Sequence, residues 1–559
     1  MKPRSPFRIL LKMFQNRFFE DDTVSPGSGF ETNIYQVLGF LATVSFFVAY
    51  LTMPAFLELS FNKVHSPATD WALRNFRLFF PALSFAAIGF TTVFQWDMLF
   101  PDRRDFLILS VFPVSPREIF AAKFAALAIF LGLLIGALNV FPTLGAALFS
   151  LSKSDAWGFG LRLVTAQIAA TAGAAIFAFL LVAAFQGMLI NVTSPRIFRR
   201  VSPWIQMFGM SMMVLSVAAY PVYLLLLKPA VEARRLWLWF FPPVWFTGLY
   251  DILLPGGDPF FASLGRYAIG ASAVVLLCFC LTWALGFSRH FRRTLEADVP
   301  SIGATVARRP VRSRLRGLAG SPEEWAMFAF CRKTLARSTK HRLFLATWLS
   351  VGISAGIFVA LSVRNGKLEW SPEGMRTFPF LIAFFVISGF RTVFQFPADL
   401  ACNWLLRITE SRWAETARRA ARKTVLISGL VPVLLAILPF EIFAAGPATG
   451  LLHVLIQLAA GALLIELMFW RFGKVPFTCS YFAGRTSLSI LAAFYLYGFT
   501  TYSFNMADWE KALEGSTIRP LAFFAVAGAA LAVLWRRSSA TQEAIFDDNE
   551  PVIRTLDLN

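Results

Sequence analysis

Long apolar segments recur along the whole chain, and they constrain its fold more than any other feature of the sequence. A helix needs roughly 20 apolar residues to cross a bilayer, and we count about twelve runs near that length. They lie near 36–57, 78–95, 120–149, 162–190, 204–227, 267–287, 343–363, 377–396, 424–445, 449–470, 485–505 and 518–535. Strand-like alternation of apolar and polar residues is lacking, which argues against a membrane barrel. The sequence predicts an all-α, polytopic integral membrane protein.

A short motif that occurs twice indicates an internal repeat. The chain reads Gly-Phe-Thr-Thr-Val-Phe-Gln at 89–95 and Gly-Phe-Arg-Thr-Val-Phe-Gln at 389–395, an offset of 300 residues (389 − 89). Each copy is followed by an acidic residue, a basic loop, a lysine (Lys123 or Lys423) and an apolar run that contains proline. Each half would hold about six crossings, an even number, so both would insert with the same orientation as parallel repeats.

The basic residues assign the predicted regions to sides of the membrane. We predict a first six-helix half at 1–290, a basic cytoplasmic linker at 291–321, a second six-helix half at 322–540 and a cytoplasmic tail at 541–559. About two thirds of the 52 lysines and arginines fall on one side of this topology, which places both termini in the cytoplasm. The net charge of +19 thus comes mainly from basic residues in the predicted cytoplasmic segments. We expect no nucleic-acid partner, because no aromatic and basic soluble module accompanies the charge.

An amphipathic segment precedes the first crossing of each half. Residues 5–19 place apolar side chains on one helical face, namely Phe7, Leu10, Leu11, Phe14 and Phe18. A less regular stripe, Trp325, Phe328 and Leu335, precedes the crossing at 343. Both segments are predicted to lie in the cytoplasmic interface, in contact with membrane lipids.

One aromatic stretch between crossings is too short and too often broken by proline to span a bilayer. Residues 237–250 read Trp-Leu-Trp-Phe-Phe-Pro-Pro-Val-Trp-Phe-Thr-Gly-Leu-Tyr. Trp and Tyr are enriched where membrane meets water. We expect the stretch to lie in the outer interface. An aromatic belt that anchors the bundle is the favoured interpretation, and a lid over a substrate exit is the alternative.

The loop after the second apolar run has the most specific pattern in the chain. Residues 97–123 read Asp-Met-Leu-Phe-Pro-Asp-Arg-Arg-Asp-Phe-Leu-Ile-Leu-Ser-Val-Phe-Pro-Val-Ser-Pro-Arg-Glu-Ile-Phe-Ala-Ala-Lys. The pattern predicts a short helix near 103–111 stopped by Pro113, then a Ser115 cap with Pro116 at the first position of the next helix. A rigid cytoplasmic knob results, and force applied to it would tilt the two helices that carry it.

This pattern resembles the coupling loop of membrane permeases of ATP-binding-cassette exporters, including bacterial permeases for lipids, polysaccharides, drugs and peptides. The amphipathic helix before the first crossing and the six helices per half are also similar to that family. The resemblance implies a multi-pass permease of a bacterial inner (plasma) membrane, powered by a separate ATPase subunit that binds ATP and magnesium. It implies that the ATPase contacts Asp102, Arg103, Arg104, Asp105, Pro113, Val114, Arg117 and Glu118.

The corresponding loop of the second half departs from this pattern, because residues 399–423 lack Pro-Val-Ser. A helical knob is still predicted, in which Glu415 and Arg419 have the spacing of an i, i+4 ion pair. A degenerate ATPase contact and a different partner both fit this loop. Its candidate contact residues are Arg407, Glu410, Arg412 and Glu415.

The chain lacks the sequence signatures of an ATPase or of a metal site. Gly473-Lys474 is followed by Val475, where a phosphate loop requires serine or threonine, and the four histidines are scattered. We therefore predict no catalytic residue, no metal ligand and no cofactor in this chain. A membrane-embedded transferase is disfavoured, because the acidic clusters that bind magnesium in such enzymes are missing.

Polar residues within the predicted crossings are candidates for a transport pathway. Asn139, Gln167 and Gln186 are polar enough to line a cavity, although helix-to-helix hydrogen bonds are the commoner role of such side chains. Apolar segments rich in Phe and Ala favour a lipid-like or amphipathic cargo. Lipid-facing surfaces have the same composition, so the substrate stays open at this point.

Arg391 and Glu466 are the ionisable candidates for the pathway, since a charge at membrane depth indicates function. Both lie within about two turns of the predicted cytoplasmic interface, where snorkelling, or a pair between Glu466 and Arg471, would satisfy them. Structural pairing is therefore the favoured role of Glu466. The alternative to the permease is an ion-coupled secondary transporter with Glu466 as its coupling carboxylate. Glu441 is predicted near the outer mouth, with an interfacial role.

Overall fold

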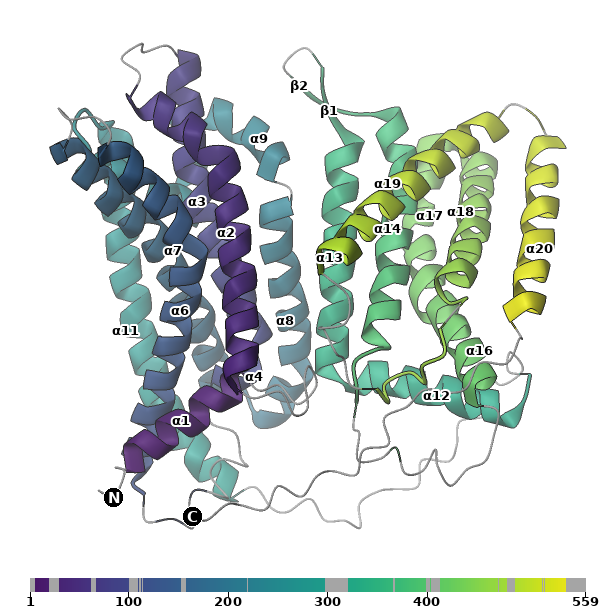
Figure 1. Cartoon of the computed structure of the whole chain (residues 1–559), viewed down its shortest axis with the longest axis horizontal. Coiled ribbons are helices and arrows are strands. Elements are labelled where there is room, and N and C mark those ends of the chain that lie inside the picture. Colours follow the sequence, from purple (N-terminus) through teal and green to yellow (C-terminus); the bar gives the residue numbers. More distant parts are fainter. Residues whose placement is uncertain are drawn as a thin grey trace. The chain divides into compact units, whose positions relative to one another are not determined.

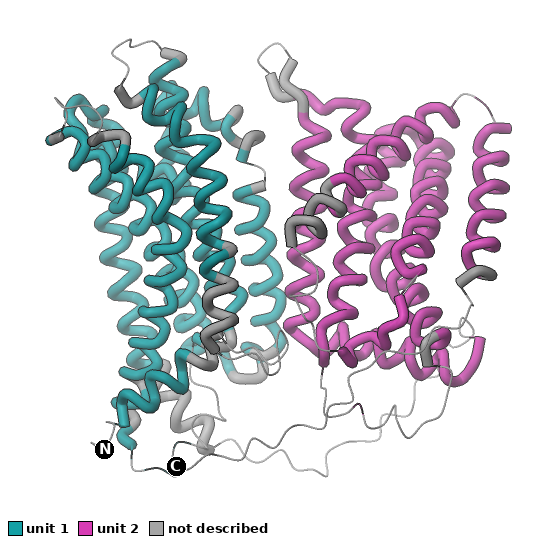
Figure 2. The backbone as a smooth tube through the Cα atoms, viewed as in Figure 1, with its two compact units in different colours: residues 1–21, 27–304 teal, residues 22–26, 305–559 magenta. Residues whose placement is uncertain are grey.

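The computed structural model describes most of the chain. The described residues are 6–19, 30–61, 67–99, 109, 112, 114–151, 157–218, 220–296, 320–364, 367–398, 403, 413–470, 472–479, 488–514, 516 and 518–538. They form helices, short connections and one two-stranded hairpin. The chain divides into two compact units, unit 1 with residues Met1–Asp21 and Gly27–Ala304, and unit 2 with Asp22–Pro26 and Thr305–Asn559 (Figure 2).

Ten of the described helices are long and apolar enough to cross a membrane. The chain is thus an all-α, multi-pass membrane protein. The predicted runs at 204–227 and 485–505 are not among the ten. The first is divided between α8, which ends at Ala218, and α9, which begins at Tyr220. The second lies in α19 (Leu488–Leu513), whose C-terminal part carries charged side chains.

Unit 1 is a bundle of long helices (Figure 1). A short helix, α10, packs among them. Its elements are α1 (Pro6–Phe19), α2 (Phe30–Phe61), α3 (Pro67–Phe94), α4 (Trp96–Leu99), α6 (Pro116–Leu151), α7 (Trp157–Val192), α8 (Pro195–Ala218), α9 (Tyr220–Glu232), the 3-10 helix η1 (Leu236–Phe240), α10 (Pro242–Leu253) and α11 (Pro259–Glu296). Helix α3 packs against α7 and α8, α2 packs against α6, and α10 contacts α3, α7 and α11.

The predicted amphipathic helix at 5–19 is confirmed as α1. Leu10 and Phe14 are buried, whereas Arg8 and Lys12 are exposed. The buried face packs on α6, because apolar residues at i and i+4 share one side of a helix. Helix α1 is thus attached to the helix that follows the predicted knob.

Unit 2 holds two closely packed helices joined by the hairpin, followed by further helical segments (Figure 1). Its elements are α12 (Pro322–Arg337), α13 (Thr339–Ala360), β1 (Leu361–Arg364), β2 (Lys367–Trp370), α14 (Pro372–Val393), α16 (Trp413–Val425), a π-helical segment (Leu426–Leu430), α17 (Val431–Ala445), α18 (Pro447–Met468), α19 (Leu488–Leu513) and α20 (Ile518–Ser538). The hairpin pairs Leu361 with Trp370 in antiparallel register, and it adds a small sheet to the predicted all-helical fold.

The five residues between α16 and α17 form a π-helix. Leu426–Leu430 runs directly into both neighbours, so three elements form one continuous rod. Within it, Gly429 approaches the ring of Phe390 on α14. Single π-helical turns inside long helices are uncommon and recur at functional positions.

Both copies of the repeated motif lie at the C-terminal ends of helices, in α3 and in α14. Their threonines bond to the preceding turn in the same way: Thr92 Oγ1 donates to the carbonyl of Ile88 at 2.6 Å, and Thr392 Oγ1 to that of Ser388 at 2.9 Å. The helices packed on the two glycines differ. A Cβ at position 89 would lie 2.8 Å from Met213 of α8, and one at 389 would lie 2.8 Å from Trp348 of α13.

Candidate functional site

The start of α6 has the capping geometry that the sequence predicts. The Glu118 backbone N–H donates to Ser115 Oγ at 3.3 Å, and the Ser115 backbone N–H donates to Glu118 Oε2 at 2.9 Å. This reciprocal pair is a capping box, which fixes the direction in which the chain enters the helix. The predicted loop therefore leads straight into a well-defined helix end.

The other predicted ATPase contacts of the first loop are only partly described. Arg117 is exposed, and Val114 and Glu118 are half-buried, so these three surround the entry to α6. The remaining contacts lie outside the described residues: Asp102, Arg103, Arg104, Asp105 and Pro113.

Replacing Ser115 with alanine should weaken the start of α6 without changing the fold. The variant loses the acceptor for the Glu118 N–H, and loss of an N-terminal cap typically costs about 1 kcal/mol. Thermal unfolding of the purified protein in detergent measures the change. Thr43→Ala, which removes a hydroxyl bonded only to the carbonyl of Gly39 in an exposed part of α2, should change stability by less than about 0.5 kcal/mol. Equal effects of both variants would contradict the capping role.

Helix α1 and the first turns of α6 form one packed body. Leu10 and Phe14 of α1 share a buried cluster with Ile119 and Ala122 of α6. The Lys123 amino group lies 5.5 Å from the centre of the Phe14 ring, within the range of a cation–π contact. A displacement of the α6 N-terminus must therefore move α1 with it.

Unit 2 joins its first helix, α12, to α16 in a related way. Lys423 of α16 forms an ion pair with Glu324 of α12, a side chain that is 4% exposed. Lys423 stands 300 residues after Lys123 (423 − 123), and each lysine contacts the amphipathic helix of its own unit. Ser321 Oγ accepts the Glu324 backbone N–H at 3.2 Å, and Glu324 Oε2 accepts the Gly320 backbone N–H at 3.3 Å, so the carboxylate belongs to the cap of α12.

The predicted pair between Glu415 and Arg419 is present in α16. The Arg419 guanidinium also lies 5.4 Å from the ring centre of Trp535 on α20. The other predicted contacts of this loop lie outside the described residues: Arg407, Glu410 and Arg412.

Glu466 is paired within unit 2, with an arginine that the sequence analysis did not name. Its Oε2 lies 2.6 Å from Arg422 Nη1, and both side chains are largely buried. Arg422 Nη2 also donates to the carbonyl of Phe469 at 3.4 Å. Arg471 lies outside the described residues. The pair links α16 to α18, which favours a structural role for Glu466. Arg391 is half-buried at the end of α14.

The three polar candidates of unit 1 each make a hydrogen bond between elements. Asn139 Oδ1 accepts from Ser84 Oγ at 2.8 Å, linking α6 to α3. Gln186 Nε2 donates to the carbonyl of Trp96 at 2.7 Å, linking α7 to α4. Gln167 accepts a hydrogen bond from the hydroxyl of Tyr250 on α10.

Two of these side chains lie far apart on one helix, because Gln167 and Gln186 stand about 28 Å apart along the axis of α7. Their hydrogen bonds match the helix-packing role, which the sequence analysis regarded as the commoner one.

A small cavity lies beside the first copy of the repeated motif. Thr91 and Thr92 of α3 and Gln95, directly after α3, line it together with Leu127 and Phe130 of α6. Its walls are mainly apolar. The first copy of the repeat thus faces α6 near the end of the helix that leads to the predicted knob.

The aromatic stretch at 237–250 divides into an exposed part and a buried part. Leu236 and Phe240 of η1 are 80% and 85% exposed, which suits a membrane interface. Helix α10 is instead buried from Pro243 to Asp251, so the expectation of an interfacial position is wrong for this part. The physical reason is that α3, α7 and α11 surround α10 and cover its apolar side chains on several sides.

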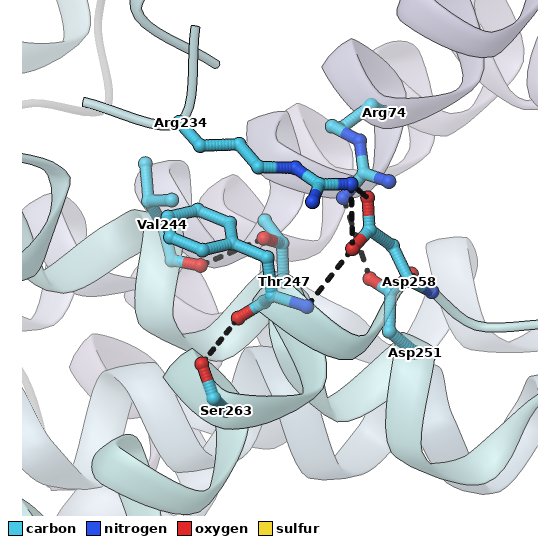
Figure 3. Close-up of polar contacts among 8 residues, drawn as sticks. Arg74, Arg234, Val244, Thr247, Asp251, Asp258 and Ser263 are labelled. Carbon is cyan, nitrogen blue, oxygen red and sulfur yellow. Dashed lines mark hydrogen bonds and ion pairs between the residues drawn. The ribbon is translucent and has the colours of Figure 1, made fainter. Parts of the chain in front are cut away.

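Two ion pairs fix the turn between α10 and α11. Arg74 Nη1 lies 3.4 Å from Asp251 Oδ2, and Arg234 Nη2 lies 3.1 Å from Asp258 Oδ2 (Figure 3). The Asp258 backbone N–H donates to Asp251 Oδ1 at 3.1 Å, which connects the two pairs. The Arg74 guanidinium also lies 3.5 Å from the ring centre of Phe261. These contacts hold the buried helix in place at the end of unit 1 opposite α1.

A second group of charges lies at the hairpin end of unit 2, and the sequence analysis found only one of its members. Glu441 accepts a hydrogen bond from Gln457 Nε2 at 3.2 Å and lies 3.2 Å from His453 Nδ1. Arg376 Nη2 lies 2.9 Å from Glu514 Oε2. Because these residues come from different helices and distant parts of the sequence, spacing alone gave no signal for the group. Glu441 is half-buried near the end of α17 and is held by residues of its own unit.

Within the part of the chain that the structure describes, no group of three or more His, Cys, Asp or Glu side chains could hold a metal ion. The buried polar groups of the two units are instead arranged as ion pairs and helix-to-helix hydrogen bonds. Comparisons of the chain with protein-family models, with curated proteins and with solved structures found no match.

Proposed function

We propose that this chain is the permease component of an ATP-binding-cassette transporter. It would move a lipid-like or amphipathic substrate across a bacterial inner membrane, using a separate ATPase subunit that binds ATP and magnesium. The proposal includes twelve crossings in two parallel six-helix repeats, with both termini in the cytoplasm.

The observation that carries the proposal is the junction of the first loop, α6 and α1. The loop enters α6 through the Ser115–Glu118 capping box. One turn later α6 packs on α1 through Lys123 and Phe14. A subunit that pressed on the loop would therefore move a helix long enough to cross the membrane together with its interfacial helix, as energy coupling requires.

Unit 2 supports the same interpretation, although an ion pair joins its two helices. The Lys423–Glu324 ion pair joins α16 to α12 in place of the cation–π contact of unit 1. The offset of 300 residues between Lys423 and Lys123 agrees with a duplicated architecture. The missing Pro-Val-Ser in the second loop suggests that the two units contact the ATPase differently.

The pairing of Glu466 with Arg422 bears on the ion-coupled alternative. A coupling carboxylate has to bind and release its ion, whereas this one is held by a buried guanidinium. The pair therefore favours the permease over a secondary transporter that uses Glu466.

The double variant Arg103→Glu plus Arg104→Glu should abolish association with an ATPase encoded beside this chain. Hydrogen bonds to charged groups contribute about 1.5–3 kcal/mol each, so loss of two should weaken binding about a hundredfold or more. Co-purification from membranes, with quantified stoichiometry, measures the effect.

The matched control is the double variant Arg162→Glu plus Arg266→Glu. It reverses the charge of two exposed arginines, one near the start of α7 and one near the start of α11. This control should leave association unchanged while imposing the same change in net charge. Both double variants should still insert into the membrane. Co-purification that stays undiminished in the Arg103 and Arg104 variant would refute the proposed docking surface.

A further inference from the structure

Ionisable side chains from four helices meet at the hairpin end of unit 2. They are Arg376 of α14, Glu441 of α17, His453 of α18 and Glu510 of α19, with Glu514 directly after α19. Three of the five are carboxyl groups, so the cluster is rich in negative charge unless protons are bound. We call this group the hairpin-end cluster.

Two of the three carboxyl groups, those of Glu441 and Glu514, pair with the basic side chains of the hairpin-end cluster. Arg376 Nη2 lies 2.9 Å from Glu514 Oε2. His453 lies between the other two partners, with Nδ1 3.2 Å from Glu441 Oε2 and Nε2 3.3 Å from Glu514 Oε1. Glu441 and Glu514 therefore hold the compensating charges.

Glu510 is the member of the cluster that remains without such a partner. Its side chain is 1% exposed, and neither carboxyl oxygen has a hydrogen-bond partner among the described residues. An ionised carboxylate in this position would lose its hydration without gaining a donor. The protonated carboxyl is neutral and has a much smaller desolvation cost.

We propose that Glu510 is a proton-binding site of unit 2. In the binding step a hydronium ion gives its proton to a Glu510 carboxylate oxygen, one O–H bond forms, and water leaves. Release is the reverse step, with water as the acceptor. The inference does not depend on the ATPase, and it would hold equally for a permease and for an ion-coupled carrier.

A proton fits the site better than a metal cation. A metal ion needs several oxygen or nitrogen ligands arranged around it, and among the described residues no group of acids and histidine, this cluster included, is placed to hold one. A proton attaches to a single oxygen and needs no coordination shell. The proton also changes the balance of charge, because an ionised Glu510 would compete with Glu441 and Glu514 for His453 and Arg376.

The surroundings tune Glu510 to bind its proton near neutral pH. Burial raises the pKa of this carboxyl from 4.5 to about 8, and the charges of Glu441 and Glu514 also raise it. His453 and Arg376 act in the opposite direction. Glu510 lies outside the ten candidate spans, at the end of α19, where exchange of the proton with water is feasible.

Isotope-edited infrared spectroscopy of the full-length protein tests the proposal. The protein is labelled at its glutamate carboxyl carbons, placed in lipid nanodiscs and titrated with base, and the C=O band of protonated carboxyl groups is followed. We expect a band that disappears with a midpoint near pH 8. It should be missing in Glu510→Gln and unchanged in Glu373→Gln, a control at the same end of the unit whose side chain is 81% exposed.

Two neighbouring variants identify the titrating group independently, including the case in which Glu510→Gln fails to fold. Glu514→Gln removes a negative charge and should lower the midpoint, whereas His453→Ala removes a positive one and should raise it. A band that persists in Glu510→Gln, a midpoint near the ordinary 4.5, or a midpoint unmoved by both neighbours would overturn the proposal. None of these readouts involves the ATPase, so this test and the co-purification test fail separately.

Discussion

Replacing Gly248 with alanine is expected to disrupt the packing of α10 in unit 1. A Cβ at this position would lie 2.1 Å from the carbonyl oxygen of Phe261 and 2.4 Å from the backbone nitrogen of Gly265. Both atoms belong to the backbone of α11, so no side-chain rotation can relieve the overlap. We expect the free energy of unfolding to fall by about 3 kcal/mol or more, at the upper end of the range for overpacked sites.

The measurement is thermal unfolding in detergent, followed by size-exclusion chromatography of the remaining folded protein. Gly270→Ala provides the matched control, since it lies on α11, the helix that Gly248 contacts, and a Cβ there meets nothing within 4 Å. Alanine is the better helix former by about 1 kcal/mol, so this control should be neutral or stabilising. A Gly248→Ala protein as stable as the control would contradict the close backbone approach of α10 to α11.

Replacing Arg422 with alanine is expected to have the largest effect on unit 2. The variant leaves Glu466 without its 2.6 Å partner in a site where both side chains are largely buried. Removing one member of a buried ion pair typically costs about 3–5 kcal/mol. Arg419→Ala is the control from the same helix, because that arginine is 37% exposed and its pair with Glu415 should contribute less than about 1 kcal/mol. Urea unfolding of the purified protein compares the two, and similar midpoints would contradict the importance of the buried pair.

The companion variant Glu466→Gln separates the two transport mechanisms. If Glu466 has only a structural role, transport should fall in proportion to the amount of folded protein, and stimulation of the partner ATPase should fall with it. Transport that is lost while ATPase stimulation persists would favour the ion-coupled alternative. Both activities are measured in the same reconstituted vesicles.

Features set by a few neighbouring residues could be predicted from the sequence. The amphipathic face of α1 follows from its i, i+4 spacing, and the start of α6 follows from Ser115 and Glu118. The i, i+4 pair of Glu415 and Arg419 is predictable for the same reason. Each of these depends only on the geometry of one helix and its first turn.

Features that depend on which helices meet could not be predicted in this way. For Glu466 the sequence offered snorkelling or a pair with Arg471, and it gave no signal for Arg422, which the structure supplies from a neighbouring helix. Proline and tryptophan suggested an interface for α10, but the packing of three helices around it decided its position. Arg376 and Glu514 of the hairpin-end cluster are 138 residues apart, so no spacing rule could connect them.

The π-helical segment at Leu426–Leu430 gives the two units different mechanical properties. In unit 1 a push on the first turn of α6 travels along a 36-residue α-helix that contains Pro142 but no π-helical turn, and this helix acts as a lever. In unit 2 the same push on α16 reaches a turn with wider hydrogen-bonded rings after 13 residues, and that turn can absorb rotation as a joint. The same force on both helices is therefore expected to tilt α6 in unit 1 and to twist the helix at the π-helical segment in unit 2.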